Sequence, residues 1–560
     1  MNVAYWINRA WHWLCRREGR DFQRSTSLVR DVQKSLLLNT IQQNAKSDYG
    51  RRFFFDRIKS IDDYRCQVPV VRYDCLREDM ERIYRGDKRV LTEEPIERLV
   101  PTGGSSGGTK LIPYTRSLKR DFQKAIAAWI WWTFQFYPQA TQGPAYWSIT
   151  PMVSPSRRSP GGLTIGFESD SEYLGNWSRW FAQQLILPPA CASRIGSIEN
   201  ARYANLLYLL ACSRLSLISI WSPTFLLSLL SQVAPWIESI CRDIDEGEVS
   251  LPQRETVQDH EGLKLRRDPR RADELKRLYR EHGNSPDLIR QCWPELSLIS
   301  CWGDGNSASY FTALKKMFPH AELQPKGLLA TECVVSFPGC ENGDSVLAIR
   351  SHFFEFAPVL ATGETDYGRL RLADELVSGD RYRVIVTTNG GLYRYDLGDI
   401  IEVVGFLRSC PRVRFVGRTD AVSDLVGEKL HEEHVRTLLE SLMSEFGVSA
   451  GFFILVARQQ PYLGYTLILS EDSNLHPEVQ GPFARALDDR LRTNPQYALA
   501  RNLNQLSSVD VRILSVTGRE LWSRYEKWQS GLGKRVGELK VNVLDYRGAW
   551  RDFLSQLDGS

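Results

Sequence analysis

The chain has 560 residues, of which 42% are hydrophobic and 25% are charged, and its 71 Lys and Arg residues nearly balance its 67 Asp and Glu residues. This composition is typical of globular proteins and excludes a wholly disordered chain. The formal net charge of +4 is too dilute over this length to indicate a nucleic acid as partner.

The N-terminal stretch, residues 1–17, is aromatic and amphipathic, with Arg9 early and no small-residue cleavage site. These features are wrong for a signal peptide. We expect a helix that packs its tryptophan face on the body of the protein, with contact to a membrane interface as the alternative. Residues 215–236 carry no charge, but Pro223 and Pro235 interrupt them. We expect a buried helical pair there and no transmembrane segment.

Hydrophobic periodicity predicts the other elements of the first 420 residues. Helices are expected at 27–42, 117–136, 268–280 and 310–317, and through most of 172–245. Extended runs are expected at 67–71, 296–302, 327–337, 346–356, 382–388, 400–406 and 413–416. Strands that interleave with helices predict an α/β fold with a mixed sheet and a smaller sheet nearby.

After residue 420 the pattern starts again, with a helix at 429–446, strands at 451–457 and 463–470, a helix at 476–493 and a strand at 509–515. An αββαβ segment of roughly 140 residues is the size of a small α+β domain. We predict a large domain over 1–417, a hinge near 418–420 and a small domain over 421–560.

Cysteine usage bears on location. The chain has 11 cysteines with no CxxC spacing, which fits neither a disulfide framework nor a zinc ribbon. His431 and His434 lie close together, but without the spacing that puts two metal ligands on one helical face. We expect a reducing, cytoplasmic location and a polar helix start at the two histidines.

The strongest motif is the loop 102–110, Thr-Gly-Gly-Ser-Ser-Gly-Gly-Thr-Lys. Its glycines let the backbone approach an anion, its hydroxyls donate hydrogen bonds and Lys110 supplies positive charge, as in a phosphate-binding loop. Thr109 separates the last glycine from the lysine, so this is not a Walker loop. Because Pro113 follows in an extended run, we expect the loop to join two strands. The alternative is a flexible glycine–serine turn.

Two carboxylates form the next signals. Glu332 follows Thr331 at the end of an apolar run, where a strand-end acid can hold Mg²⁺; the alternative is a surface glutamate. Asp399 ends the segment Tyr393-Arg-Tyr-Asp-Leu-Gly-Asp and precedes another apolar run. A carboxylate at a turn into a strand can accept hydrogen bonds from ribose hydroxyls, and an acidic hairpin turn is the alternative.

The last signals lie where the pattern restarts and near the C-terminus. The glycine-flanked, charged segments 417–420 and 427–429 are typical of a hinge between domains, with an ordinary surface linker as the alternative. Lys540, in Gly-Glu-Leu-Lys, is by itself typical of a surface residue.

In this order, the five segments resemble the adenylate-forming superfamily of acyl-CoA synthetases, peptide-synthetase adenylation domains and luciferases. The closer resemblance is to the auxin-responsive Gretchen Hagen 3 family of acyl acid amido synthetases, and it covers nearly the whole chain. It is carried by the segments 48–50, 61–64, 68–70, 110–113, 293–296, 354–356 and 393–399.

The resemblance implies an α/β fold, with a large N-terminal adenylate-forming domain of mixed sheets flanked by helices and a smaller, mobile C-terminal α+β domain. It implies ATP and Mg²⁺ as cofactors, and a small carboxylic acid and an amino acid as substrates that are joined as an amide. Transfer of the acyl group to a thiol such as coenzyme A, and a non-catalytic nucleotide-binding scaffold, are the alternatives.

The family's functional residues carry over by position. Those at the ATP phosphates are Thr102, Ser105, Ser106, Gly107 and Lys110, and those that frame adenine are Gly303, Asp304 and Gly305. Thr331 and Glu332 fall at the α-phosphate and Mg²⁺, Asp399 at the ribose, Arg418 and Asp420 at the pivot, and Lys429 and Lys540 where small-domain lysines reach the active site. Two departures stand out: the phosphate loop is one residue shorter than in plant members, and Val541-Asn542 follows Lys540 where the family usually has Pro-Arg.

Overall fold

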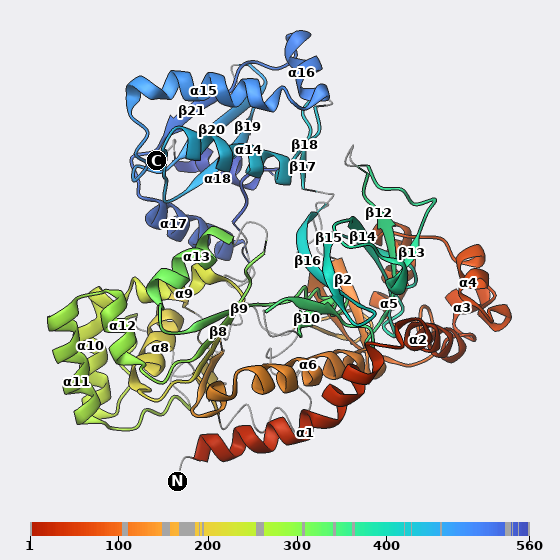
Figure 1. Ribbon diagram of the computed structural model, residues 1–560, viewed down its shortest axis with the longest axis horizontal. Coiled ribbons are helices and arrows are strands. Elements are labelled where there is room, and N and C mark those ends of the chain that lie inside the picture. The colour runs from red at the N-terminus through yellow and green to blue at the C-terminus, as the bar shows by residue number, and fades with distance from the viewer. Residues whose placement is uncertain are drawn as a thin grey trace. The chain divides into compact units, whose positions relative to one another are not determined.

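A computed structural model of the protein divides into two compact units, Met1–Phe415 and Val416–Ser560 (Figure 1). The boundary falls inside one strand, β16 (Cys410–Arg418). The structure describes residues 3–102, 110–147, 157–166, 185–189, 191–192, 195, 197–253, 262–304, 308–339, 343–360, 364–418, 421–426, 428–459, 462–532, 539, 541–546 and 548–557.

The first unit contains a five-stranded sheet with the order β6-β3-β7-β8-β9, and every pairing in it is parallel. Its strands are β3 (Ala145–Trp147), β6 (Ile186–Leu187), β7 (Leu217–Ser219), β8 (Leu298–Cys301) and β9 (Glu322–Pro325). Parallel sheets need cover on both faces, and β7 and β8 are accordingly buried along their whole length.

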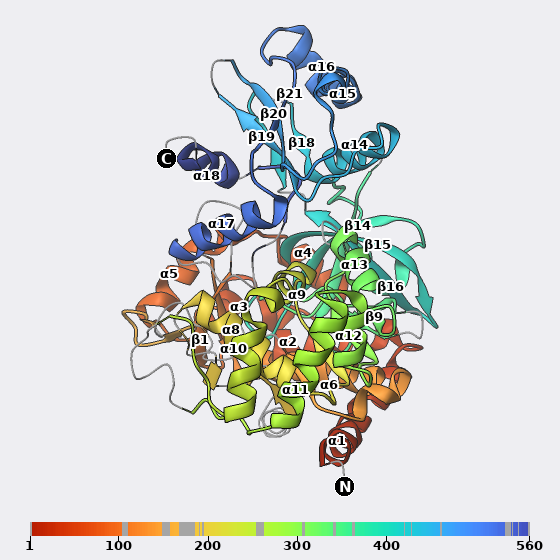
Figure 2. The same cartoon turned by 90° about the vertical axis from the view of Figure 1, so that its left-hand side faces the viewer.

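Alternating side chains of these strands enter two different cores, as the period of two requires. Ile218 and Ile299 join a core built with six helices: α8 (Ile198–Ala211), α9 (Pro223–Leu230), α10 (Val233–Glu246), α11 (Pro269–His282), α12 (Pro286–Cys292) and α13 (Ala308–Met317). Figures 1 and 2 show α10, α11 and α12 together as one layer. Leu217 and Leu298 instead join Trp11.

Trp11 belongs to the first of two long helices, α1 (Val3–Ser25) and α6 (Arg116–Phe136), which cover this second face. Gly19 of α1 lies so close to α6 that a Cβ atom there would approach the ring of Trp131 to 2.3 Å. The absence of a side chain at this position therefore lets the two helices touch.

The largest core of the first unit lies around a seven-stranded sheet with the order β10-β11-β16-β15-β14-β12-β13. Besides β16, its strands are β10 (Ser336–Pro338), β11 (Ser345–Leu347), β12 (Phe353–Pro358), β13 (Arg371–Leu372), β14 (Arg381–Thr387) and β15 (Tyr395–Leu407). A four-stranded sheet, β2-β1-β5-β4, contains β1 (Ile96–Thr102), β2 (Lys110–Thr115), β4 (Arg157–Arg158) and β5 (Thr164–Ile165).

Further helices of the first unit lie in the described ranges. The α-helices are α2 (Val29–Gln43), α3 (Asp48–Arg52), α4 (Ile61–Gln67) and α5 (Arg77–Arg85), and the 3₁₀ turns are η1 (Phe55–Arg57), η2 (Tyr73–Leu76), η3 (Pro138–Thr141) and η8 (Ala373–Glu375). Ser47 and Ser60 cap α3 and α4 by accepting hydrogen bonds from backbone N–H groups in the first turn, as N-cap serines do.

The second unit has a three-stranded sheet, β19-β20-β21, and a two-stranded ribbon, β17-β18. Its elements are β17 (Val422–Ser423), β18 (Leu430–His431), α14 (Glu432–Glu445), β19 (Phe453–Arg458), β20 (Gly464–Leu469), α15 (Pro477–Leu491), α16 (Pro495–Asn502), β21 (Asp510–Ile513), α17 (Gly518–Gly531) and α18 (Ala549–Leu557). Alternation again divides the sheet, because Leu467 packs in the core of α14 and α15 whereas Ile468 packs with α17 and α18.

The helices expected at 27–42, 117–136, 268–280 and 310–317 are confirmed, as is the αββαβ order of the second unit. Residues 215–236 are buried core as expected, but they also contain the strand β7. The run 346–356 was wrongly predicted as one strand, since a turn separates β11 from β12, and only the end of 327–337 is a strand. The sequence pattern also missed α16, α17 and α18.

Across the described ranges, no single helix is long and apolar enough to cross a membrane, and one bent pair, α9 with α10 at 71°, passes the same test. Within the same ranges, no group of three or more His, Cys, Asp or Glu side chains is arranged to hold a metal ion. His431 is the N-cap residue of α14 and His434 lies in its first turn, so the expected helix start at the two histidines is confirmed.

Candidate active site

The loop 102–110 connects two antiparallel strands. Thr102 at the end of β1 is paired with Lys110 at the start of β2, so the expectation that the loop joins strands is confirmed. Ser105, Ser106 and Gly107 lie outside the described residues. The ammonium of Lys110 lies 5.8 Å from the ring centroid of Tyr73.

Thr331 and Glu332 form the tip of a tight turn between β9 and β10. The turn is closed by the Ala330 N–H, which donates to the Cys333 carbonyl at 2.9 Å. The Tyr114 hydroxyl, on β2, donates to the Thr331 carbonyl at 2.5 Å. The strand that begins with Lys110 is therefore tied directly to the turn that carries Glu332.

A buried histidine holds the other side of this turn. The N–H of Val334 donates to Nε2 of His352 at 3.3 Å. Burial lowers the pKa of His352 to about 3, with a smaller contribution from the charge of Lys124. The imidazole is therefore neutral at physiological pH and can accept this hydrogen bond.

Asp399 lies on β15, in the same seven-stranded sheet as β10, the strand that follows this turn. Burial raises the pKa of the Cys333 thiol well above its usual value, and the charges of Glu332 and Asp399 raise it further. The negative charges of both carboxylates therefore act on one buried thiol. Asp399 was predicted at a turn before a strand, which is wrong, because β15 begins at Tyr395 and Asp399 is a buried residue inside it.

The segment expected at adenine follows β8. Asp304 accepts a hydrogen bond from the N–H of Phe415 on β16 at 3.2 Å, and Trp302 packs on the Phe415 ring with centroids 5.4 Å apart. Burial raises the pKa of Asp304 to about 6. A Cβ atom on Gly303 would come within 3.0 Å of the Phe311 ring, and Gly305 lies outside the described residues.

These contacts link four predicted segments within the first unit. The Tyr114 hydroxyl joins β2 to the Glu332 turn, and this turn leads into β10, a strand of the sheet that contains β15. In that sheet β15 lies beside β16, whose Phe415 N–H binds Asp304. Arg418 and Lys429 belong to the second unit. Asp420 and Lys540 lie outside the described residues.

A buried ion-pair network that the sequence did not reveal supports β15. Asp396 accepts hydrogen bonds from Arg383 Nε at 2.5 Å, from the Tyr367 hydroxyl at 2.7 Å and from the Gly398 N–H at 3.0 Å. Two residues earlier, Arg394 donates to Glu355 at 2.8 Å. Buried ion pairs with several hydrogen bonds fix one geometry, so this network sets the position of the strand segment that carries Asp399.

An aromatic cavity with a buried cation lies beside the turn. Leu329 and Val334, on either side of Thr331 and Glu332, line it together with Trp129, Trp221 and Lys326. The Lys326 ammonium donates to the Ser219 hydroxyl at 3.0 Å and lies 4.2 Å and 5.4 Å from the ring centroids of Trp221 and Trp129. Sequence motifs do not reveal this cavity, because its lining comes from three distant segments.

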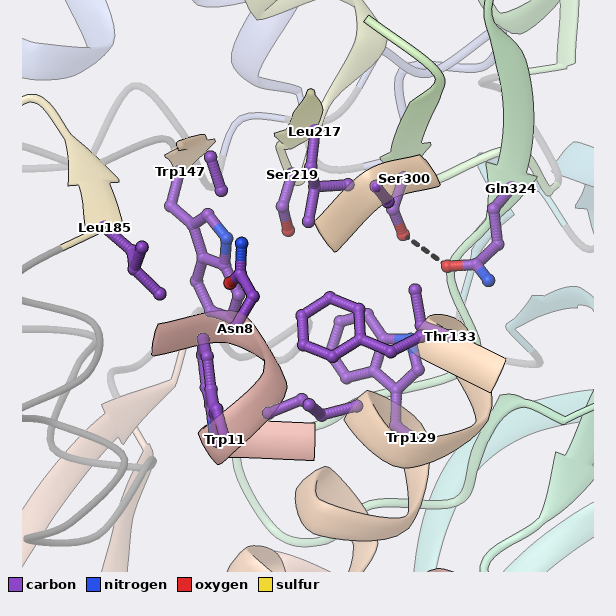
Figure 3. Close-up of a pocket in the computed structure, with 14 residues that line it drawn as sticks. Asn8, Trp11, Trp129, Thr133, Trp147, Leu185, Leu217, Ser219, Ser300 and Gln324 are labelled. Carbon is purple, nitrogen blue, oxygen red and sulfur yellow. Dashed lines mark hydrogen bonds between the residues drawn. The ribbon is translucent and has the colours of Figure 1, made fainter. Parts of the chain in front are cut away.

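Trp129 also lines a second cavity, between the parallel sheet and the helices α1 and α6, and Ser219, the hydrogen-bond partner of Lys326, lines this second cavity too. Figure 3 shows Ser219 and Ser300, from neighbouring strands, on one side and Trp11 and Trp129, from the two helices, on the other. Ser300 donates to the side-chain carbonyl of Gln324 at 3.0 Å. The second cavity thus continues the aromatic lining around the Lys326 head group.

Comparisons with known proteins now place the chain in a family. The sequence model of the GH3 family N-terminal domain matches residues 19–323, and that of the GH3 family central domain matches residues 345–418. The chain therefore belongs to the GH3 family, and the resemblance read from its motifs is confirmed.

The relatives agree with this placement. The indole-3-acetic acid-amido synthetase GH3.8 of Oryza sativa subsp. indica is 24% identical over 431 residues, which are 74% of this chain and 70% of that protein. GH3.3 of Arabidopsis thaliana, another indole-3-acetic acid-amido synthetase, is 23% identical and covers 81% of this chain and 78% of its own. The solved GH3.15 acyl acid amido synthetase shares the fold, with a TM-score of 0.81, 18% identity and coverage of 97% and 96% of the two chains. The predicted fold class is confirmed.

Proposed function

We propose that this protein is an ATP-dependent acyl acid amido synthetase. A carboxylate oxygen of the acid attacks the α-phosphorus of ATP and displaces pyrophosphate, which leaves an acyl adenylate. The amine nitrogen of an amino acid then attacks the acyl carbonyl carbon, loses a proton and displaces AMP. The observation that carries the proposal is the hydrogen bond from Tyr114, on the strand that begins with Lys110, to the turn that carries Glu332. This turn leads into β10, which belongs to the same sheet as β15, the strand that carries Asp399.

The phosphates would be bound by Thr102, Ser105, Ser106, Gly107 and Lys110, whose amides, hydroxyls and ammonium complement an anion. Since phosphoryl chemistry leaves little covalent work for the protein, these groups act by positioning and by offsetting charge.

Glu332 would hold Mg²⁺. This ion binds through one or two carboxylates together with substrate phosphates, so the single half-buried glutamate of this turn suits it, and a full protein cage is not needed. Mg²⁺ would supply positive charge to the phosphates. Thr331, whose carbonyl is fixed by Tyr114, would face the α-phosphate.

Asp399 would accept hydrogen bonds from the ribose hydroxyls, and the segment Gly303, Asp304 and Gly305 would frame adenine. Arg418 and Asp420 would form the hinge between a large domain, 1–417, and a small mobile domain, 421–560. Rotation there would bring Lys429 or Lys540 to the cleft in turn, so that one cleft serves two reactions.

The acyl group would occupy the aromatic cavity lined by Trp129, Trp221 and Lys326, because this cavity adjoins the Glu332 turn. Large aromatic walls favour planar, apolar acids. Relatives are named for indole-3-acetic acid, and GH3.15 has been solved in complex with 2,4-DB; acids of this aryl type are the class we propose. All ten cysteines in the described ranges are free thiols, which supports a cytoplasmic location.

Pyrophosphate release from MgATP tests the function, with a panel of aryl and alkyl carboxylic acids, each supplied with mixed amino acids, with coenzyme A, or with neither. We expect acid-dependent release that amino acids accelerate, with an amide product identified by mass spectrometry. Release stimulated only by coenzyme A would show that the product is a thioester and not an amide. Absence of release with every acid, together with absence of ATP binding by calorimetry, would overturn the nucleotide assignment.

A further inference from the structure

We infer that the outer face of α1 is a docking surface for anionic lipid membranes. The inner face of this helix is accounted for, because Trp11, Cys15 and Phe22 are buried in the cores of the first unit. The expectation that the tryptophans of residues 1–17 pack inward is therefore only partly right. Trp11 does so, whereas the other two point into solvent.

The exposed side chains form one apolar stripe. Val3, Trp6, Trp13 and Leu14 are 67%, 57%, 67% and 45% exposed, and Ala10 between them is also exposed. Their spacing of i, i+3, i+7, i+10 and i+11 places them on one side of a helix. Two exposed tryptophans on a single stripe are unusual on a surface that faces only water.

The charges next to the stripe are all positive. Residues 3–17 contain three arginines, Arg9, Arg16 and Arg17, and no acid. Over the described residues these three arginines form no ion pair, and all three are exposed. Arg17 continues the stripe toward the C-terminus, and Arg9 and Arg16 border it.

The first two acidic residues of α1 form contacts with arginines that lie outside residues 3–17. Glu18 accepts a hydrogen bond from Arg350 at 2.7 Å, and Asp21 lies 3.8 Å from Arg24. The electrostatic potential around the N-terminal half of α1 is consequently positive. Burial lowers the pKa of His12, and the positive charges of Arg9 and Arg16 lower it further.

Charge complementarity and side-chain type together identify an anionic membrane as the partner of the outer face of α1. Tryptophan prefers the boundary between headgroups and acyl chains, and arginine binds anionic headgroups, so a helix with both on one outer face lies in the membrane plane. The stripe from Val3 to Arg17 is about 20 Å long at 1.5 Å per residue, which spans several headgroups. Figures 1 and 2 show α1 at an edge of the first unit, where a flat surface can reach it.

Co-sedimentation with vesicles tests this surface. The full chain is mixed with phosphatidylcholine vesicles with and without phosphatidylserine, at about 50 mM and about 0.5 M salt. We expect binding to the anionic vesicles at low salt. Trp6→Ser/Trp13→Ser and Arg16→Gln/Arg17→Gln should each weaken it by roughly tenfold or more.

A matched double variant, Tyr462→Ser/Leu532→Ser, removes two residues of the second unit that are 72% and 63% exposed and should bind like wild type. Because all altered residues are exposed, the urea midpoint should not move. The inference is overturned if wild type does not bind anionic vesicles, if binding ignores salt and phosphatidylserine, or if it survives loss of both tryptophans. Concentration-dependent dimers that disappear in Trp6→Ser/Trp13→Ser, without vesicle binding, would assign the face to a second copy and also overturn it.

Discussion

The Tyr114 hydroxyl donates its hydrogen bond to the Thr331 carbonyl at 2.5 Å across 217 positions of sequence. Tyr114 lies four residues after Lys110, and Thr331 immediately precedes Glu332. One hydrogen bond thus fixes the spacing between the strand that carries the cation and the turn that carries the carboxylate. Groups that act by positioning depend on such fixed spacing.

Tyr114→Phe removes this hydrogen bond and keeps the ring. We expect kcat for acid-dependent pyrophosphate release to fall by about 10- to 100-fold, while KM for the acid changes little. Stability should fall by only about 1 kcal/mol, because one hydrogen bond is lost. Tyr208→Phe is the control, since its hydroxyl also donates to a backbone carbonyl, that of Lys264 at 3.1 Å, away from the site. Equal losses of kcat in both variants would show that Tyr114 has no specific positioning role.

Glu332→Gln keeps the size of the side chain and removes its charge. We expect a loss of turnover of roughly 100-fold and a higher Mg²⁺ concentration at half-maximal rate. Glu402→Gln is the control, because Glu402 lies on β15 as Asp399 does but contacts Arg414 at 3.2 Å near the surface. A Glu332→Gln enzyme with wild-type Mg²⁺ dependence would refute the metal role.

The sequence predicted much of the fold, and its motifs named candidate residues of the site, for physical reasons. The long helices α2, α6 and α14 show clear periodicity, and the motif that ends in Asp399 has a distinctive run of turn and polar residues. In contrast, β7 (Leu217–Ser219) has only three residues and lies between helices, and a short buried strand cannot be told from a buried helix by periodicity.

The parts of the site that were missed depend on long-range contacts. Nothing next to Lys326 in sequence marks it as buried, because Trp129 lies 197 positions before it and Trp221 lies 105 positions before it. The Arg383–Asp396 pair likewise brings together two strands, and a lysine or aspartate alone is usually read as a surface residue. Only the packed structure shows that these charges are internal.

Lys326→Met tests whether the aromatic cavity binds the acid. The substitution keeps most of the side-chain volume and removes the ammonium that contacts Trp221 and Ser219. We expect KM for the acid to rise by about tenfold, with KM for ATP unchanged. Lys315→Met, at a half-exposed lysine of α13, is the control. If only the KM for ATP increased, the acid would have to bind in another cavity.

His352→Gln removes the titration of the buried histidine and keeps a hydrogen-bond acceptor at this position. The pKa of His352 is lowered from 6.5 to about 3, so the unfolded chain binds a proton more tightly than the folded one. The stability linked to this group is fully present above pH 6.5 and is lost as the pH falls from 6.5 toward 3, at about 1.4 kcal/mol per unit of pKa difference.

Glutamine does not titrate in this range, and its carbonyl can still accept from the Val334 N–H. We therefore expect the free energy of unfolding in urea to decline less steeply with acid in His352→Gln than in wild type. His476→Gln, at an exposed histidine of the second unit, should follow the wild-type curve. If His352→Gln retained the full acid dependence, some other group would be responsible for it. If that variant also kept wild-type turnover at neutral pH, the glutamine would be holding the Glu332 turn as the neutral imidazole does.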